Sequence, residues 1–191
     1  MLSLTAAEKK ILLASAREAL VAAIFHDSQP RKVKHEVPAA ASGLLYGLPC
    51  GVFVSLHTKN GALRGCIGSL IPDKPLYIMV RRMACAAAFE DPRFPPLTPG
   101  ELDVCRIEIS VLSPMEQCES PNAIEPGIHG VYLTYHGRSG VFLPQVPIEQ
   151  GWSRVEYLDN LCLKAGVPPK SYKADDARLW TFTACVFGEE F

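Results

Sequence analysis

Several features that would assign a function class at once are missing from this sequence. Its 191 residues carry 19 lysines and arginines against 20 aspartates and glutamates, a formal net charge of −1. Proteins that bind nucleic acid through its phosphates carry a basic surface, so this balance argues against that class, although a local basic patch is compatible with it. No apolar run approaches the roughly 20 residues of a membrane-spanning helix. The first residues also lack the ordered basic, apolar and cleavage regions of a secretory signal.

Metal and disulfide patterns are missing as well. The seven cysteines are an odd number, and none belongs to a CxxC pair or to a Cys/His cluster at zinc-ligand spacing. The five histidines include no HxH or HxxxH pair. The sequence therefore predicts no metal and no cofactor. Unpaired thiols are typical of a reducing compartment, and we expect a cytoplasmic protein.

What is present is the composition of a globular protein, with 48% hydrophobic and 20% charged residues. A chain of this length buries roughly 70% of its unfolded surface and needs no disulfide or metal to fold. Three helices are predicted from their N-terminal signals, and a glycine and a proline, Gly166 and Pro168, end the third. These signals are Thr5 with Glu8, Asp73 as a cap with Pro75 inside the first turn, and Ser153 with Glu156.

Two tight turns set the fold class. Asn60-Gly61 and His136-Gly137 each join two predicted strands, and such hairpins require antiparallel neighbours. The sequence therefore predicts an α+β fold, a mainly antiparallel sheet with flanking helices. We expect one domain over residues 1–191, with a possible lobe boundary near 114–128. The predicted strands cover residues 51–57, 63–70, 104–111, 130–135, 139–143 and 179–187.

The first hairpin places a cysteine on a polar strand face. With Asn60-Gly61 at the centre of a two-residue turn, opposed residues point to the same side of the sheet. One side then carries the apolar residues, and the other carries polar side chains and two glycines, Gly65 and Gly68, which often mark close approach of a ligand or another backbone. The predicted pairs are His57 with Arg64, Ser55 with Cys66 and Phe53 with Gly68.

Cys66 is the strongest candidate for chemistry. An adjacent guanidinium favours the thiolate, so Arg64 is predicted to anchor an anion beside a nucleophilic or ligand-binding thiol. The alternative is an inert buried cysteine, with Arg64 paired to a carboxylate such as Glu108. The other six cysteines are interpreted as structural.

Three further residues are candidates. His129 lies among glycines in a loop and is a candidate general base; alternatively it bonds nearby backbone in a turn. His57 is a weaker candidate base, because a histidine on an edge is usually solvated. Asp91 and Arg93 form a carboxylate and guanidinium pair on a stiff proline-rich loop, and they either lock that loop or touch a substrate.

Four motifs together resemble one family. LRGCIG from Leu63, DPRFPPL from Asp91, IEISVLSP from Ile107 and GRSGVFLPQV from Gly137 occur in the order and spacing of the AMMECR-type domain. Prokaryotic members are labelled AmmeMemoRadiSam system protein A. The resemblance runs from about residue 51 to residue 187, and a tyrosine, Tyr172, stands where a tryptophan is expected.

The resemblance implies a larger and a smaller lobe with a cleft between them. It also implies partnership with a Memo-type protein and a radical SAM enzyme, which makes the protein a partner or substrate-presenting component of a modification system. The alternative is a thiol-dependent transferase or hydrolase with Cys66 as nucleophile and His129 as base. The resemblance gives neither a reaction nor an oligomeric state. The candidate cleft or ligand-binding residues are Arg64, Gly65, Cys66, Gly68, Asp91, Arg93, His129 and Gln145.

Overall fold

The computed structural model describes residues 3–25 and 50–190. The chain forms two compact units, each with its own sheet. In the described residues, the first unit comprises 3–112 and 185–190, and the second comprises 113–184. Helices together with two antiparallel sheets confirm the predicted α+β class.

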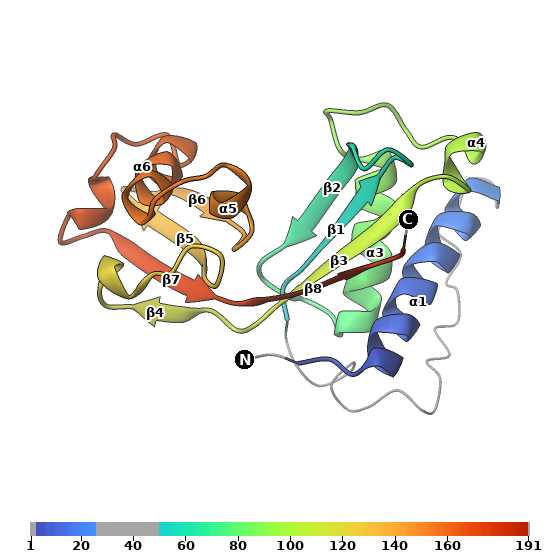
Figure 1. Cartoon of the computed structure of the whole chain (residues 1–191), viewed down its shortest axis with the longest axis horizontal. Helices are drawn as coiled ribbons and strands as arrows, with labels where there is room; N and C mark the ends of the chain where they lie inside the picture. The colour runs from blue at the N-terminus through green and yellow to red at the C-terminus, as the bar shows by residue number, and fades with distance from the viewer. Residues whose placement is uncertain (1–2, 26–49, 191) are drawn as a thin grey trace. The chain divides into compact units, whose positions relative to one another are not determined.

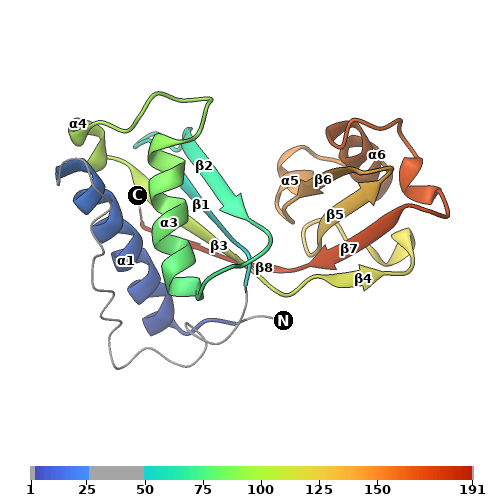
Figure 2. The same cartoon turned by 180° about the vertical axis from the view of Figure 1, so that it is seen from behind.

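The first unit has a four-stranded sheet in the order β2-β1-β3-β8. Two helices, α1 and α3, lie on one side of this sheet, as both views show (Figures 1 and 2). The elements are α1 (Ala6–Phe25), β1 (Val52–His57), β2 (Leu63–Ser69), α3 (Leu76–Phe89), the short helix α4 (Pro99–Leu102), β3 (Arg106–Leu112) and β8 (Ala184–Gly188).

Alternation along β1 and β3 produces the core beneath α1 and α3. Val52, Val54 and Leu56 are fully buried, while the residues between them are only half-buried. Because successive strand residues point to opposite faces, the latter lie on the side away from the helices. We call this side the open face, since no helix among the described residues of the first unit covers it. Its central residues are Phe53, Ser55, His57, Cys66, Arg106 and Glu108.

The second unit has a four-stranded sheet in the order β4-β7-β5-β6 (Figure 1). Its core forms around the fully buried Tyr157, where one face of the sheet packs against α6. The elements are β4 (Glu116–Cys118), η1 (Pro121–Ala123), β5 (Gly130–Tyr135), β6 (Arg138–Phe142), α5 (Val146–Glu149), α6 (Arg154–Lys164), η2 (Ser171–Lys173) and β7 (Arg178–Phe182).

Two of the three predicted helix starts are confirmed. Thr5 and Glu8 form reciprocal hydrogen bonds before α1, and Ser153 and Glu156 do so before α6. The prediction for Asp73 is wrong: Pro75 occupies the N-cap of α3. The Asp73 carboxylate instead accepts two hydrogen bonds from Arg82, at 2.7 and 2.9 Å.

The predicted strand at 179–187 is two strands. β7 ends at Phe182, β8 begins at Ala184, and they belong to different sheets. At the break, the backbone N–H of Thr183 donates to Ser113 Oγ at 3.0 Å. The three-residue strand β4 was not predicted. No helix in the described ranges combines the length and apolar character required to cross a membrane.

Candidate functional site

The hairpin that carries Cys66 has a different turn from the predicted one. Thr58 N–H donates to Ala62 O at 2.8 Å, which encloses a three-residue loop ending at Gly61 in a left-handed conformation (φ 81°). The extra residue shifts the register between Leu56 and His57. The pairings of Ser55 with Cys66 and of Phe53 with Gly68 are confirmed. The predicted pairing of His57 with Arg64 is wrong.

Cys66 lies on the edge strand β2 with its side chain half-buried. The Ser55 hydroxyl on β1 donates a hydrogen bond to Cys66 Sγ at 3.2 Å. Directly opposed side chains on a sheet lie close together, so the strand pairing itself creates this contact. The thiol therefore has a fixed neighbour on the open face.

Asp91 and Arg93 hold the outer edge of β2. The backbone N–H of Cys66 donates to Asp91 Oδ2 at 2.8 Å, and Arg93 Nη2 donates to the Cys66 carbonyl at 3.3 Å. An edge strand exposes unpaired backbone groups, and here the loop satisfies those of Cys66. Of the two predicted roles of this pair, locking the loop is therefore seen directly. A contact with substrate stays a prediction.

The same contacts fix the charge of Asp91. Its side chain is only 2% exposed, and Arg93 donates to both carboxylate oxygens, at 2.9 and 2.7 Å. These hydrogen bonds hold the pKa of Asp91 well below its usual range, against the opposing effect of burial, and the Cys66 N–H acts in the same direction. Asp91 is consequently an anion throughout the neutral range.

Arg64 is held by α4. Its Nε and Nη2 donate to the two carboxylate oxygens of Glu101 at 2.7 and 3.1 Å. The hydrogen bond from Arg64 lowers the pKa of Glu101 to about 2. The expected carboxylate partner, Glu108, is thus the wrong residue. The guanidinium seen in contact with Cys66 belongs to Arg93, and the anion-anchor role of Arg64 stays a prediction.

The two glycines beside Cys66 are both covered, and Gly65 is approached closely by another backbone, one of the two alternatives named for these glycines. A Cβ atom at Gly65 would lie 2.1 Å from Ala87 O in α3. One at Gly68 would lie 2.2 Å from the ring of Phe53. Gly65 pairs with the buried Leu56 and so faces the helices, on the side opposite Cys66. The strand needs glycine at both positions for packing; their part in a ligand site stays a prediction.

The remaining predicted site residues, His129 and Gln145, lie in the second unit. His129 Nδ1 accepts a hydrogen bond from the Glu125 N–H at 3.0 Å, the turn contact foreseen as the alternative. In the neutral ring this places the proton on Nε2, so a base role requires that contact to break. Gln145 precedes α5, and its Oε1 is buried with no hydrogen-bond partner in the described structure. The pairing of Cys66 with His129 stays a prediction, as does the cleft.

Glu108 is a site residue that the sequence analysis considered only as a partner for Arg64. It lies on β3 directly opposite Ser55, so Cys66, Ser55 and Glu108 form a row across three strands of the open face. His57 Nε2 lies 3.9 Å from Glu108 Oε1. Apolar and polar residues alternate over 104–111, and this pattern puts Glu108 on the polar side of the strand. The pairing of β1 with β3 was the information missing from the sequence.

The contacts of Asp91, Arg93 and Ser55 fix the position of the Cys66 thiol on the edge strand β2. Within the described structure, Ser55 is the only side chain that hydrogen-bonds the Cys66 sulfur. The neighbouring charges are engaged in ion pairs. No group of three or more His, Cys, Asp or Glu side chains able to hold a metal occurs in the described ranges.

Comparisons with known proteins identify the family. The AMMECR1 family model matches residues 13–187. The protein MK0488 of Methanopyrus kandleri is 39% identical over 98% of this chain and 91% of its own length. TK0174 of Thermococcus kodakarensis is 43% identical over 74% of this chain and 73% of its own.

A solved structure agrees with the fold. The crystal structure of the uncharacterized protein PH0010 from Pyrococcus horikoshii matches with a TM-score of 0.86 and 34% sequence identity. The match covers 98% of this chain and 94% of that one. Family model, relatives and solved structure all span most of the sequence, and they confirm the resemblance carried by the four motifs: the chain belongs to the AMMECR1 family.

Proposed function

We propose that this protein is a non-catalytic component of a protein-modification system and acts with a Memo-type protein and a radical SAM enzyme. It docks to a partner through the open face around Cys66, where it presents the thiol or a ligand bound beside it. The family resemblance supports the kind of partner. The local chemistry of Cys66 supports the docking role.

The observation that carries the proposal is the Asp91 contact. A general base must accept a proton near neutral pH, and the pKa of Asp91 is held far below that range by Arg93. Arg64 is likewise engaged by Glu101. The ionic groups around Cys66 therefore hold the strand in place and are poorly suited to moving protons.

The experiment is a pull-down of purified Memo-type and radical SAM proteins with the tagged full-length chain. Four proteins are compared: wild type, Cys66→Ser, Ser55→Lys and Gln117→Lys. Ser55→Lys places a charged side chain at the centre of the open face. Gln117→Lys is the matched control, because Gln117 lies on β4 of the second unit and is exposed.

We expect capture by wild type, Cys66→Ser and Gln117→Lys, and loss of capture by Ser55→Lys. Circular dichroism melts of all four proteins establish that each is folded. Equal capture by Ser55→Lys would exclude docking through this face. If the wild type captures neither the Memo-type protein nor the radical SAM protein, the proposed partnership is wrong.

A second candidate is a thiol-dependent transferase or hydrolase with Cys66 as nucleophile. The hydrogen bond from Ser55 favours it, because this contact holds the Cys66 sulfur in a fixed position on an edge strand. The test is the iodoacetamide alkylation rate at pH 7, followed by peptide mass spectrometry, with the half-buried Cys118 as internal reference. This candidate requires Cys66 to react faster than Cys118 and Ser55→Ala to slow that reaction; equal rates would contradict it.

A further inference from the structure

The sheet of the first unit ends in two edge strands, β2 and β8, and the two edges differ in how they are covered. On β2, the Asp91 carboxylate accepts the Cys66 N–H at 2.8 Å, and Arg93 donates to the Cys66 carbonyl at 3.3 Å. These side chains occupy the positions in which a neighbouring strand would place its own backbone groups. A further strand is therefore excluded from the middle of the β2 edge.

The outer edge of β8 has no such cover. The Ser113 N–H donates to Thr183 O at 2.9 Å, and the Glu189 N–H donates to Ile107 O at 2.9 Å. These bonds fix the direction of the backbone groups at both ends of the strand, and that direction alternates from one residue to the next. The residues whose N–H and C=O groups point away from the sheet are therefore Ala184, Val186 and Gly188. No strand among the described residues pairs with β8 on that side.

The side chains of β8 offer none of the usual protection of an exposed edge. Edge strands are commonly blunted by charged residues, by proline or by a bulge, because an unpaired edge is a template for another strand. The five residues of β8 include no charged residue and no proline. Val186, at the centre of the strand, is 43% exposed. The strand is therefore suited to pairing with a further strand.

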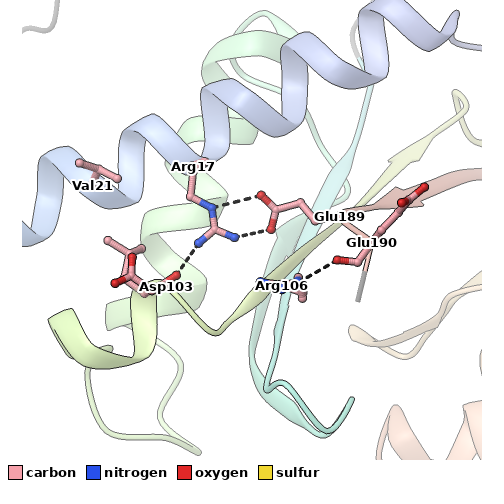
Figure 3. Close-up of a pocket in the computed structure, with 7 residues that line it drawn as sticks. Arg17, Val21, Asp103, Arg106, Glu189 and Glu190 are labelled. Atoms are coloured by element: carbon pink, nitrogen blue, oxygen red, sulfur yellow. Dashed lines mark hydrogen bonds and ion pairs between the residues drawn. The ribbon is translucent and has the colours of Figure 1, made fainter.

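Contacts at the C-terminal end of β8 hold the strand in an extended conformation. Glu189 is ion-paired with Arg17 of α1 (Figure 3), and its carboxylate also accepts the Ile107 N–H at 3.0 Å. Arg106 Nε donates to the Glu190 carbonyl at 2.8 Å (Figure 3). A strand that is already ordered loses little conformational entropy when it pairs with another, so this edge is preorganised for association.

The β8 edge is complementary to itself. Two antiparallel copies of the strand overlap fully when Val186 lies opposite Val186 of the second copy, and Ala184 then lies opposite Gly188. Each pair joins small or apolar residues, and no pair brings like charges together. The first acidic side chain after the strand, Glu189, is already engaged by Arg17. A second copy thus carries a matching edge by symmetry, whereas any other partner must supply a matching strand.

We infer that two copies of this chain associate through β8, antiparallel about a two-fold axis at Val186, so that one sheet continues into the other. Opposed residues share a face of a sheet, and both open faces therefore lie on the same side of the dimer. The association stops at two copies, because Asp91 and Arg93 cover the other edge of each sheet. The inference goes beyond the proposed docking role, since it uses neither the Cys66 thiol nor a partner of another kind.

The test is sedimentation equilibrium of the full-length chain in reducing buffer. The chain concentration runs from about 5 to about 200 µM, because an interface of one strand pair is small and is expected to be weak. We expect the mass to rise with concentration from that of one chain to that of two. The mass of one chain throughout this range would overturn the inference. A mass that continues to rise beyond two chains would contradict the closed dimer.

Two variants and a matched control locate the interface. Val186→Lys places two like charges opposite each other at the two-fold axis and should weaken association about tenfold or more. Val186→Pro removes the outward N–H without removing a bond to β3 and should have the same effect. Ile71→Lys changes another exposed apolar residue of the first unit, outside its strands, and should leave association unchanged. Circular dichroism melts show whether each variant is folded.

A cross-link tests the register. Directly opposed residues of this kind have Cα atoms about 5.5 Å apart, a separation that a disulfide spans. Copper-catalysed air oxidation of Val186→Cys should therefore give a covalent dimer, and peptide mass spectrometry should find the two introduced thiols joined to each other. Wild type oxidised in the same way is the control. A dimer that persists in folded Val186→Lys and Val186→Pro, or a Val186→Cys dimer without this cross-link, would overturn the inference.

Discussion

The open face of the first unit has two ends that differ in how their polar groups are satisfied. At the Cys66 end, backbone and side-chain groups are paired with Asp91, Arg93 and Ser55. At the other end, His57 Nε2 is buried without a partner and faces Glu108 from 3.9 Å. Paired groups fix a conformation, whereas a buried polar group without a partner costs free energy. The Cys66 end is therefore fixed by its polar contacts, whereas the His57 end contains a buried polar atom without one.

The largest effect should come from filling the space at Gly65. A Cβ atom there would lie 2.1 Å from the Ala87 carbonyl, so Gly65→Ala forces β2 away from α3. We expect about 3 kcal/mol less stability toward urea unfolding. Gly100→Ala is the control, because nothing lies within 4 Å of its added Cβ and it should change little. A stable Gly65→Ala protein with Cys66 contacts unchanged would show that close packing does not set this end of the face.

The next effect should come from removing the charge that anchors Cys66. Asp91→Asn weakens the bonds to Arg93 and to the Cys66 N–H. We expect a loss of about 2 kcal/mol, the range for hydrogen bonds to a charged group. Hydrogen exchange measured by mass spectrometry should rise in the peptide containing Cys66, while peptides of the second unit keep their protection. Uniform acceleration across the chain would show instead that the contact stabilises the whole fold.

Low pH should destabilise the fold through the ion pairs at the Cys66 end of the open face. Glu101 has a folded-state pKa of about 2 against an ordinary value of 4.5, and the pKa of Asp91 is also lowered. Their contribution to stability is therefore present above about pH 4.5 and is lost as the pH falls through the folded-state values.

Glu101→Gln should reduce that acid-dependent loss by about 1 kcal/mol, a small amount because solvent screens a partly exposed pair. Urea unfolding between pH 3 and pH 7 measures it. An identical pH profile for wild type and variant would show that the Arg64 pair does not contribute to stability.

The smallest effect should come from Ser55→Ala. Ser55 makes one side-chain hydrogen bond, to a sulfur, and a loss of about 0.5 kcal/mol is expected in urea unfolding. The informative comparison is between stability and Cys66 alkylation rate in the same protein. If stability falls as far as in Asp91→Asn, Ser55 belongs to the contacts that hold the strand.

Local signals in the sequence predicted many elements correctly. The reciprocal bonds at Thr5 and Ser153, the hairpin ending at Gly61 and the pairing of Ser55 with Cys66 each depend on residues close in sequence. The pairing of His57 failed because the loop has one extra residue, and a register shift between Leu56 and His57 compensates for it, so the pairs further from the turn keep the predicted register.

Non-local contacts were beyond prediction from one sequence. Glu101 rather than Glu108 pairs with Arg64, across 37 residues of sequence. The break at Thr183 also follows from long-range pairing, since β7 and β8 join different sheets. The motif DPRFPPL indicated a rigid loop, but only the fold showed that its Asp91 holds the backbone of Cys66.

The sequence by itself determined the α+β class, the family and the strand on which Cys66 lies, because these depend on periodicity, capping and motif order. The tertiary structure decided which groups surround that strand. It covered the two glycines, placed Arg64 against α4, and brought His57, Arg106 and Glu108 together at one cavity. Side chains from strands far apart in sequence meet through sheet pairing, and a single sequence does not encode that pairing in any local pattern.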